Sequence, residues 1–216
     1  MTAAGFASIV LDVDSTLCGI EGIDWLAALR GAAVGAEVSA LTDRAMRGEI
    51  ALESVYGQRL ALVAPGRDEI AALSRAYVAS VAPGAVAAVT RLRHAGRRVV
   101  LVSGGLREAI LPVAALVGLG DADVHAVSVH VDARGAYAGF DTATPLATAG
   151  GKPIVVKALR LPSRALAVGD GVTDVAMRPA VDAFAAFTGF VRREPVVSSA
   201  DFVLTTFDQL LELALG

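Results

Sequence analysis

Apolar and polar positions along this chain follow two patterns, one typical of buried strands and one typical of helices. Short continuous apolar runs bounded by turn residues indicate strands that are buried on both faces, as in a parallel sheet. Three such runs are each followed directly by an acidic or glycine-rich segment: Phe6–Leu11, Arg98–Val102 and Ala165–Val168. Ala183–Phe187 and Phe202–Leu204 predict further strands. The pattern therefore predicts a parallel sheet in which several strands end in polar residues.

Helical spacing dominates the stretch between the first two of these strands. Helices are predicted at Ile23–Leu29, Val38–Arg47, Leu52–Leu62 and Asp68–Val81. Pro83-Gly84 opens another helix, and from there strand and helix alternate, as βαβ units require. We therefore predict an α/β fold with a Rossmann-like parallel-sheet core at residues 1–16 and 82–216. A small helical cap, residues 17–81, is inserted after the first strand.

Three local features of the second half refine this prediction. Pro112 lies inside an otherwise helical stretch, and we expect it to split or kink that helix. Val127–Val131 and Tyr137–Phe140 flank a turn and predict a hairpin on the rim of the molecule. Lys152–Leu161 is predicted to form a helix that leads into the last strands of the sheet.

Composition narrows the class of protein without indicating a function. Hydrophobic residues make up 55% of the 216 residues, yet no stretch approaches the roughly 20 apolar residues that span a bilayer, and no signal-peptide pattern opens the chain. The net charge of -3 and the scattered Lys and Arg residues argue against a nucleic-acid partner. Cys18 is the single cysteine, which excludes an internal disulfide and fits a reducing compartment. We expect a soluble, cytoplasmic protein that does not associate with membranes; the sequence leaves a homodimer open.

Two pairs of aspartates follow predicted strands. Asp12 and Asp14 alternate along an extended chain, and Asp170 and Asp174 follow a later strand. Either pair alone is compatible with turn and helix-capping chemistry. In an open α/β sheet, however, ligands bind beyond the carboxyl ends of the strands, so these carboxylates are expected to converge. Converging carboxylates repel unless a cation intervenes, and Mg²⁺ is the usual cation beside phosphate.

A glycine-rich segment and a lysine complete the candidate chemistry. Ser103, Gly104 and Gly105 offer a hydroxyl and unhindered N–H groups at an expected helix start, which suits a phosphate; an ordinary helix N-cap is the alternative. Lys152 can neutralise the same phosphate, although in isolation it would be read as a surface residue. The order of these segments on separate strand ends favours phosphoryl transfer through an aspartate.

These segments, in this order and spacing, resemble the haloacid dehalogenase superfamily of phosphatases with an aspartate nucleophile. Within it they resemble the phosphoserine phosphatase family in its short form, without an appended regulatory domain. The matching segments are Asp12–Thr16, Val102–Gly105, Gly150–Lys152 and Gly169–Asp174, with Glu21–Asp24, Arg59–Leu62 and Tyr137–Asp141 elsewhere. The resemblance covers nearly the whole chain. It implies the haloacid dehalogenase fold and a Mg²⁺-dependent phosphomonoester hydrolase that converts O-phospho-L-serine to L-serine and phosphate in serine biosynthesis.

The resemblance also implies roles for the core residues. Asp12 is expected to attack phosphorus and to carry a phospho-aspartyl intermediate, while Asp14 acts as general acid and then as general base. Mg²⁺ is expected on the Asp12 carboxylate, the Asp14 backbone carbonyl and Asp170. The phosphoryl oxygens are assigned to Ser103, Gly104 and Lys152, and Asp174 is expected to orient Lys152 or the waters on the metal.

Substrate choice is expected to depend on the cap. Glu21 suits the ammonium of phosphoserine and Arg59 its carboxylate, although a helix-dipole acid and an exposed arginine are the ordinary alternatives. Met46 is expected to line the pocket, with packing as an equal reading, and Gly105 and Thr173 are expected to contact the substrate.

Two departures from the family pattern leave the substrate open. Leu52 stands where the family often has an aromatic residue, and Arg47 where it often has glycine. The alternatives are another small phosphomonoester, phosphotransfer to an alcohol, and, more distantly, a non-catalytic sensor of phosphorylated ligands. A sensor is disfavoured because Asp12, Asp14 and Asp170 are all present.

Overall fold

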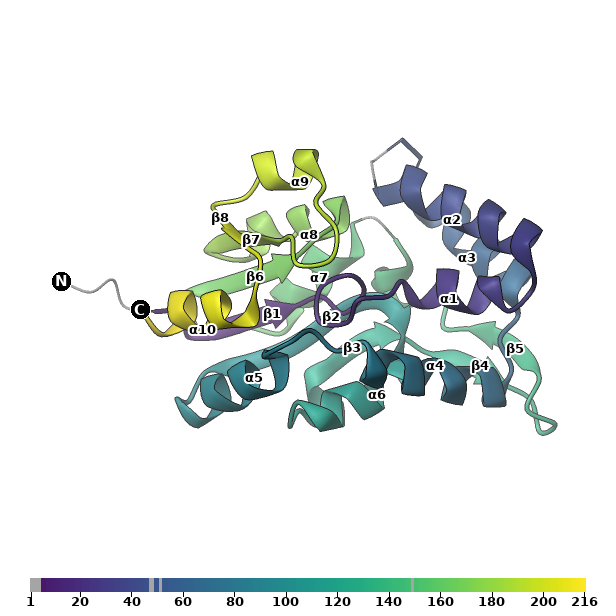
Figure 1. The fold of residues 1–216 in the computed structure, drawn as a ribbon, viewed down its shortest axis with the longest axis horizontal. Coiled ribbons are helices and arrows are strands. Elements are labelled where there is room, and N and C mark those ends of the chain that lie inside the picture. Colours follow the sequence, from purple (N-terminus) through teal and green to yellow (C-terminus); the bar gives the residue numbers. More distant parts are fainter. Residues whose placement is uncertain (1–4, 47–48, 51, 149) are drawn as a thin grey trace.

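The computed structural model describes residues 5–46, 49–50, 52–148 and 150–216, without the side chains of residues 45–46 and 52–54. Within these residues, six strands form one parallel sheet in the order β3-β2-β1-β6-β7-β8 (Figure 1). The strands are β1 (Ser8–Leu11), β2 (Arg98–Leu106), β3 (Val124–Val127), β6 (Ala165–Gly169), β7 (Ala183–Phe187) and β8 (Phe202–Leu204). The predicted parallel α/β fold is thus confirmed.

β1 lies in the middle of the sheet and fixes where the polar segments emerge. All of its residues are buried, and it pairs with β2 on one side and with β6 on the other. Leu11 lies opposite Leu101 of β2 and Val168 of β6. Because these strands run in the same direction, the segments that follow them leave the sheet at one edge.

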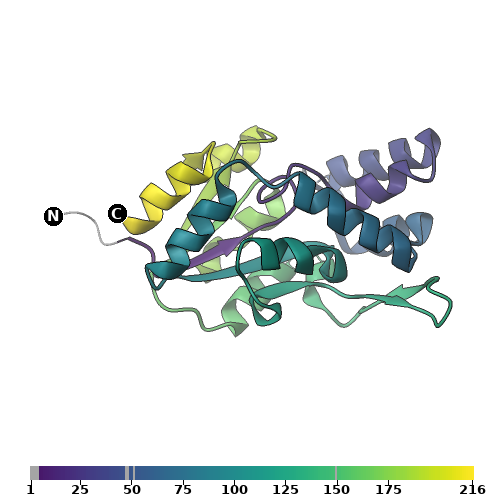
Figure 2. The same cartoon turned by 60° about the horizontal axis from the view of Figure 1, so that its bottom comes forward.

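Helices cover both faces of the sheet (Figures 1 and 2). They are α5 (Ala85–His94), α6 (Arg107–Leu116), α7 (Gly151–Ala158), α8 (Val172–Val175), α9 (Glu194–Ser198) and α10 (Phe207–Leu215). On α5 the buried residues are Ala85, Ala88, Val89 and Leu92, the spacing of a single helix face. That face packs against β2 and α10, so the amphipathic pattern decides how the helix lies on the sheet.

The described chain between β1 and α5 forms a helical insert. Its helices are α1 (Gly22–Ala28), α2 (Ala32–Met46), α3 (Leu52–Val63) and α4 (Arg67–Ala79). The insert lies beyond the carboxyl edge of the sheet, at the opposite end of the molecule from α10 (Figure 1). α4 runs alongside α6 and packs on it, so one helix of the insert is tied to the core (Figure 2).

The predicted hairpin is shorter than expected. Val124–Val127 forms β3, which pairs with β2, whereas only β4 (Val129–Val131) pairs with β5 (Tyr137–Phe140). The prediction of one strand from Val127 to Val131 was therefore wrong. A run of valines favours a strand without specifying its partner, and here the chain changes partner at Ser128.

Two predictions about helix boundaries also need correction. Ser103 to Gly105 do not open a helix: β2 continues to Leu106, where it pairs with Val127, and α6 begins at Arg107. Pro112 does not split the following helix, because α6 runs continuously through it, and the kink stays a prediction. A proline at this position removes only the bond to one earlier carbonyl, and the buried face of α6 outweighs that loss.

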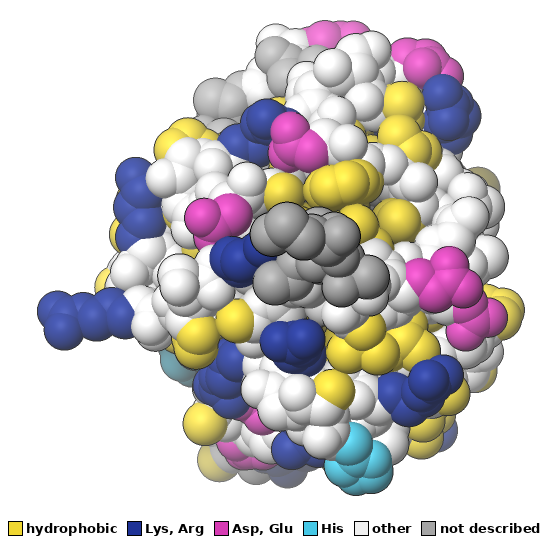
Figure 3. All heavy atoms as spheres, turned by 90° about the vertical axis from the view of Figure 1, so that its left-hand side faces the viewer, with side chains coloured by type: hydrophobic (Ala, Val, Ile, Leu, Met, Phe, Trp, Pro, Cys, Tyr) yellow, Lys and Arg dark blue, Asp and Glu magenta, His cyan; other side chains and the backbone are white. Residues whose placement is uncertain are grey.

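The end of the molecule that carries α10 shows charges of both signs. Among the described side chains of this face, Lys and Arg are separated by acidic, polar and hydrophobic residues and do not gather into a stripe (Figure 3). None of the helices in the described part of the chain combines the length and the apolar character that a membrane span requires.

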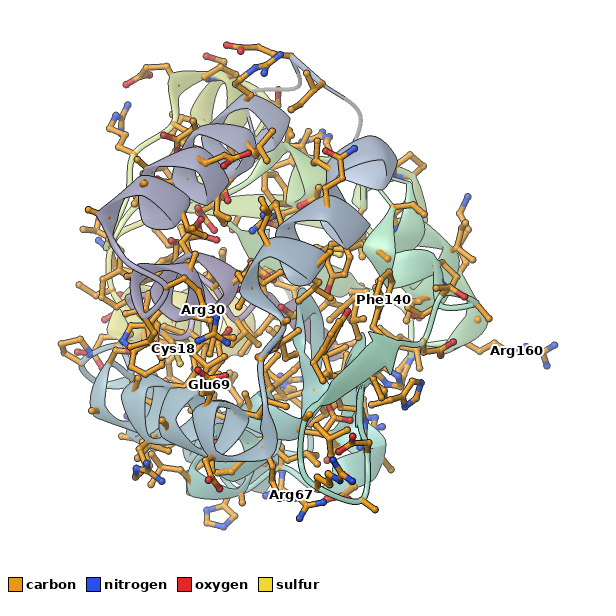
Figure 4. All side chains as sticks on the ribbon, turned by 90° about the vertical axis from the view of Figure 1, so that its right-hand side faces the viewer. Cys18, Arg30, Arg67, Glu69, Phe140 and Arg160 are labelled. Carbon is orange, nitrogen blue, oxygen red and sulfur yellow. The ribbon has the colours of Figure 1, made fainter. Side chains whose placement is uncertain are left out.

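One contact within the helical insert and two contacts with the neighbouring hairpin involve residues labelled in Figure 4. Arg30, after α1, forms an ion pair with Glu69 of α4. Arg67 at the start of α4 donates its backbone N–H to the Gly135 carbonyl in the hairpin turn (2.8 Å). Phe140 of β5 packs edge-on against Tyr56 of α3, with ring centroids 5.4 Å apart. The hairpin therefore braces α3 and α4 from the side.

Candidate active site

The loop after β1 brings two carboxylates into a pocket between the sheet edge and the helical insert. Asp12 is buried directly beyond β1, and Asp14 lines the same pocket. Ser15 has a left-handed backbone conformation (φ 52°). The chain then turns back, and the backbone of Cys18 forms an isolated β-bridge with that of Asp14. Such conformations are uncommon outside glycine and concentrate at functional sites.

The loop after β6 adds two more carboxylates. A Cβ on Gly169 would lie only 2.1 Å from Asp174 Cγ, so glycine is required where Asp174 folds back over the strand end. Asp174 Oδ2 accepts a hydrogen bond from the Gly171 N–H (2.9 Å) at the start of α8. Carboxylate oxygens of Asp12, Asp170 and Asp174 lie within 4.8 Å of one another. The two loops therefore form one acidic cluster.

Lys152 enters this cluster from the start of α7. Its Nζ donates to Asp12 Oδ1 (2.7 Å) and to Asp174 Oδ1 (2.6 Å), and its side chain is only 7% exposed. Burial alone lowers the pKa of a lysine, but the charges of Asp12 and Asp174 outweigh it and hold the pKa of Lys152 above its usual value. The side chain is thus a fixed positive charge at the floor of the pocket and not a surface residue.

The acidic cluster changes the protonation of its members. The pKa of Asp12 is raised to about 7 by burial and by the charge of Asp174, against the lowering effect of Lys152. The pKa of Asp14 is raised well above its usual value by burial and then by the charges of Glu21 and Asp12. Burial and neighbouring negative charge thus favour the protonated form of both carboxyl groups, and a raised pKa suits a carboxyl group to general acid chemistry.

The donors in this cluster fit a hard divalent cation. The carboxylates of Asp12, Asp170 and Asp174 are all oxygen donors, and they converge in a buried site. Among the described residues, Lys152 and Arg193 bring positive charge to these carboxylates, and the Arg193 guanidinium forms an ion pair with Asp170. These three carboxylates therefore form a cluster that could hold a metal ion.

The end of β2 supplies the opposite wall of the pocket. Ser103 is buried, and its Oγ accepts a hydrogen bond from the Gly105 N–H (3.0 Å). The Gly104 carbonyl accepts a hydrogen bond from Tyr56 Oη of the insert (2.7 Å). Ser103 and Gly104 line the pocket beside Lys152. We call Ser103–Gly105 the phosphate loop below.

Two charged residues of the insert face the same pocket. Arg59 on α3 is only 4% exposed, and its Nε has no hydrogen-bond partner among the described residues. Glu21, which precedes α1, accepts a hydrogen bond from Ser15 Oγ (2.7 Å) and lies 3.6 Å from Arg193. A buried guanidinium nitrogen without a partner is costly, and an acceptor group of a ligand in this pocket would offset that cost.

The remaining predicted residues divide into two groups. Thr173 lines the pocket next to Asp174. Gly105 is not among the residues that line the pocket, although a Cβ built on it would lie 3.1 Å from Asp14 Oδ2. The side chains of Met46 and Leu52, and the whole of Arg47, lie outside the described residues.

Two further residues, which the sequence pattern does not single out, contact the acidic groups. Arg193 precedes α9 and reaches both Asp170 and Glu21, joining the core loop to the insert. Tyr77 of α4 is fully buried and donates its hydroxyl to Asp14 Oδ1 (2.6 Å). Burial and the Asp14 charge keep the pKa of Tyr77 well above its usual value, so its phenol remains a donor. No local pattern marks either residue, because both contacts join segments that are distant in sequence.

Known proteins share the fold and much of the sequence of this chain. A model of the haloacid dehalogenase-like hydrolase family matches residues 9–179. The phosphoserine phosphatase of Mus musculus is 38% identical over 207 residues, which cover 94% of this chain and 91% of that protein. A phosphoserine phosphohydrolase-like protein from Francisella tularensis has the same fold, with a TM-score of 0.86 at 24% identity over 95% of this chain and 98% of that one.

A further structure with the same fold is described as a phospho-aspartyl intermediate analogue of phosphoserine phosphatase. It has a TM-score of 0.78 at 24% identity, and the match covers 97% of this chain and 99% of that one. The family match spans most of the chain, and the relative from mouse spans nearly all of it. The chain therefore belongs to the haloacid dehalogenase-like hydrolase family, within which it is similar to phosphoserine phosphatases.

Proposed function

We propose that this protein is a Mg²⁺-dependent phosphoserine phosphatase that works through a phospho-aspartyl intermediate on Asp12. The observation that supports phosphoserine as the substrate is the buried Arg59, whose Nε has no hydrogen-bond partner among the described residues. Arg59 shares one pocket with Glu21 and with the acidic cluster. Phosphoserine presents a phosphate, an ammonium and a carboxylate. The pocket offers a matching charge for each of the three.

In the first step the Asp12 carboxylate attacks phosphorus, and the bond between phosphorus and the serine oxygen breaks. Asp14 donates its proton to that oxygen, because a serine alkoxide is a poor leaving group at neutral pH. The raised pKa of Asp14 supports this role, since burial and the charges of Glu21 and Asp12 favour its protonated form. L-Serine then leaves, and the phosphoryl group remains on Asp12.

In the second step a water molecule attacks the phosphoryl group on Asp12. Asp14, now without its proton, accepts a proton from that water, and the bond between Asp12 and phosphorus breaks. Inorganic phosphate leaves, and both aspartates return to their starting state. Ser103, the Gly104 N–H and Lys152 hold the phosphoryl oxygens throughout, and Asp174 orients Lys152 through their 2.6 Å contact.

The Asp12 carboxylate, the Asp14 backbone carbonyl and Asp170 would hold Mg²⁺ in this scheme. When bound, the ion neutralises charge on the phosphoryl group and on the surrounding carboxylates. Asp174 is a further carboxylate of the cluster, but its contact with Lys152 and with the Gly171 N–H favours a supporting role.

Mg²⁺ should raise the melting temperature of the protein at both pH values. The rise should be larger by roughly 3 °C at about pH 8 than at about pH 6. The pKa of Asp12 is raised to about 7 and that of Asp14 is also raised, so the native metal-free protein keeps protons that the unfolded chain releases above about pH 4. Its free energy of unfolding therefore falls as the pH rises toward 7. Mg²⁺ binds the ionised carboxylates and stabilises more where protons no longer compete. Thermal unfolding in EDTA and in MgCl₂ at both pH values measures this difference.

NaCl at matched ionic strength controls for screening, and Asp170→Asn should reduce the Mg²⁺ effect at both pH values. EDTA should also stop phosphate release, and added Mg²⁺ should restore it. Equal stabilisation at the two pH values, or activity that survives chelation, would contradict the metal assignment.

The helical insert would act as the cap that selects the substrate. We assign the cap to residues 17–81 and the core to residues 1–16 and 82–216. Glu21 would bind the ammonium and Arg59 would grip the carboxylate with two parallel hydrogen bonds. Thr173, Gly105 and Met46 would contact the body of the substrate.

The wild-type enzyme should prefer O-phospho-L-serine to O-phosphoethanolamine by at least about 100-fold in kcat/KM. The two substrates share the phosphate and the ammonium, but phosphoethanolamine lacks the carboxylate that Arg59 would bind. Arg59→Ala should therefore lower kcat/KM for phosphoserine by about 100-fold and leave phosphoethanolamine within a few-fold of wild type. Phosphate release from both substrates, measured with Mg²⁺, tests the proposed function.

Arg67→Ala, at an exposed position at the start of α4, is the matched control and should leave both values unchanged. An equal loss on both substrates would show that Arg59 is structural. A flat profile over a panel of phosphomonoesters would keep the chemistry but not the substrate, and phosphate transfer to added alcohols would identify a transferase. No phosphate release from any substrate of the panel would favour the alternative of a non-catalytic sensor of phosphorylated ligands.

We also infer a reducing compartment such as the cytoplasm, because the one cysteine, Cys18, is buried and unpaired. The homodimer remains a prediction that a measurement of molecular mass in solution can test.

A further inference from the structure

We propose that Tyr77 is a positioning residue for Asp14. In this view its hydroxyl fixes one carboxylate oxygen, so that the other oxygen faces the phosphate loop and passes the proton to the leaving group. The inference rests on the proposed function, in which Asp14 is the general acid. Tyr77 belongs to α4 of the helical insert and is not among the residues that line the pocket, so it acts through Asp14.

Two donors converge on the same oxygen of Asp14. Tyr77 Oη donates to Asp14 Oδ1 at 2.6 Å, and the Gly22 N–H donates to that atom at 3.0 Å. An oxygen that accepts two such hydrogen bonds has no room for a proton of its own on the same side. The proton of the acid form is therefore directed to Oδ2.

Oδ2 lies on the side of the phosphate loop. A Cβ built on Gly105 would be 3.1 Å from Asp14 Oδ2. The same Gly105 donates its N–H to Ser103 Oγ (3.0 Å), so this oxygen sits next to the groups proposed to hold the phosphoryl oxygens. When these groups hold the phosphoryl group of the substrate, the leaving-group oxygen on its phosphorus would lie within reach of Asp14 Oδ2 and not of Oδ1.

The chain leaves room for this contact at Gly22. A Cβ on Gly22 would lie 2.0 Å from Tyr77 Oη, so any larger residue would displace the hydroxyl or the start of α1. Tyr77 is fully buried, and a buried phenol needs a hydrogen-bond partner. Asp14 is the partner that the structure gives it. The contact is therefore specific to a tyrosine at 77 and a glycine at 22.

The chemistry provides a readout that separates positioning from folding. An alkyl leaving group such as serine needs a proton from Asp14, whereas 4-nitrophenolate leaves as a stable anion and needs none. The ratio kcat/KM reports only the steps up to the first phosphoryl transfer, in which Asp14 acts as acid. A mispositioned Asp14 should thus lower kcat/KM for the alkyl substrate alone.

Tyr77→Phe removes the hydroxyl and keeps the ring. We expect kcat/KM for O-phospho-L-serine to fall at least about tenfold, and kcat/KM for 4-nitrophenyl phosphate to stay within about twofold of wild type. Inhibition by inorganic phosphate should be unchanged, because the phosphate loop is intact. Tyr137→Phe, which removes a hydroxyl from a half-buried tyrosine on β5, is the matched control and should alter neither substrate.

Equal losses on the two substrates would show that Tyr77 is merely structural, and no loss on either would show that Asp14 needs no such anchor; both outcomes overturn the inference. Should the Phe variant fail to fold by circular dichroism, Gly22→Ala displaces the hydroxyl from the other side and must give the same selective loss. A wild-type enzyme that does not hydrolyse phosphoserine refutes the proposed function itself. That result is seen before the variants are compared, and it removes the inference as well.

Discussion

Replacing Asp12 with Asn is expected to lower kcat by more than about four orders of magnitude. The amide has nearly the shape of the carboxylate but cannot attack phosphorus, so no phospho-aspartyl intermediate forms. Folding should survive, because Lys152 keeps its second partner, Asp174, at 2.6 Å. Phosphate release measures the loss, and the intact mass of acid-quenched protein should show the added phosphoryl group in the wild type only.

The control for this experiment is Asp43→Asn, a change of the same kind at an exposed position of α2. It should leave turnover unchanged. The Asp12→Asn protein must be checked by mass for deamidation, which would restore the aspartate. Residual activity above about 1% of wild type in an undeamidated sample would rule out Asp12 as the nucleophile.

Lys152→Met should impair both activity and stability. Phosphate release should fall by about 10²- to 10³-fold, because a positive charge aimed at the phosphoryl oxygens is lost. The free energy of unfolding of the metal-free protein should fall by about 3 kcal/mol, because Asp12 and Asp174 remain buried without their shared cation. Activity assays and urea unfolding in EDTA measure the two effects.

Lys157→Met is the matched control, since it makes the same substitution at an exposed position of the same helix, α7. It should change neither quantity appreciably. Part of the stability lost in Lys152→Met should return on addition of Mg²⁺, which supplies positive charge to the same carboxylates. Similar losses in the two variants would mean that the effect belongs to the helix and not to the buried charge.

The parallel architecture could be predicted because buried parallel strands have a strong local signature. Ser8–Leu11, Ala165–Gly169 and Ala183–Phe187 are short, apolar and bounded by turn residues, and each lies where the sequence pattern predicts a strand. The polar segments that follow these strands must leave the sheet at the same edge, because parallel strands run in the same direction. The apolar pattern alone therefore suffices to group Asp12, Ser103 and Asp170 in one site.

The errors in the prediction arose where local patterns permit more than one partner. Val127 and Val129 are similar residues two positions apart, yet the first pairs with β2 and the second with β5. Ser103–Gly105 resembles a helix start, but the buried Leu106 continues the strand to its pairing with Val127. Secondary-structure boundaries of this kind depend on tertiary contacts, which a single sequence pattern does not contain.

The α/β fold, the helical insert and the grouping of the core motifs can be read from the sequence, because each depends on periodicity or on short segments. The burial of Arg59, with an Nε that has no partner among the described residues, emerges only from packing. The same holds for the contacts of Arg193 with Asp170 and Glu21, and for the hydrogen bond from Tyr77 to Asp14. Burial and contacts between distant segments set the charge, the pKa and the orientation of these groups. Those quantities depend on distances in three dimensions, and no local run of residues encodes them.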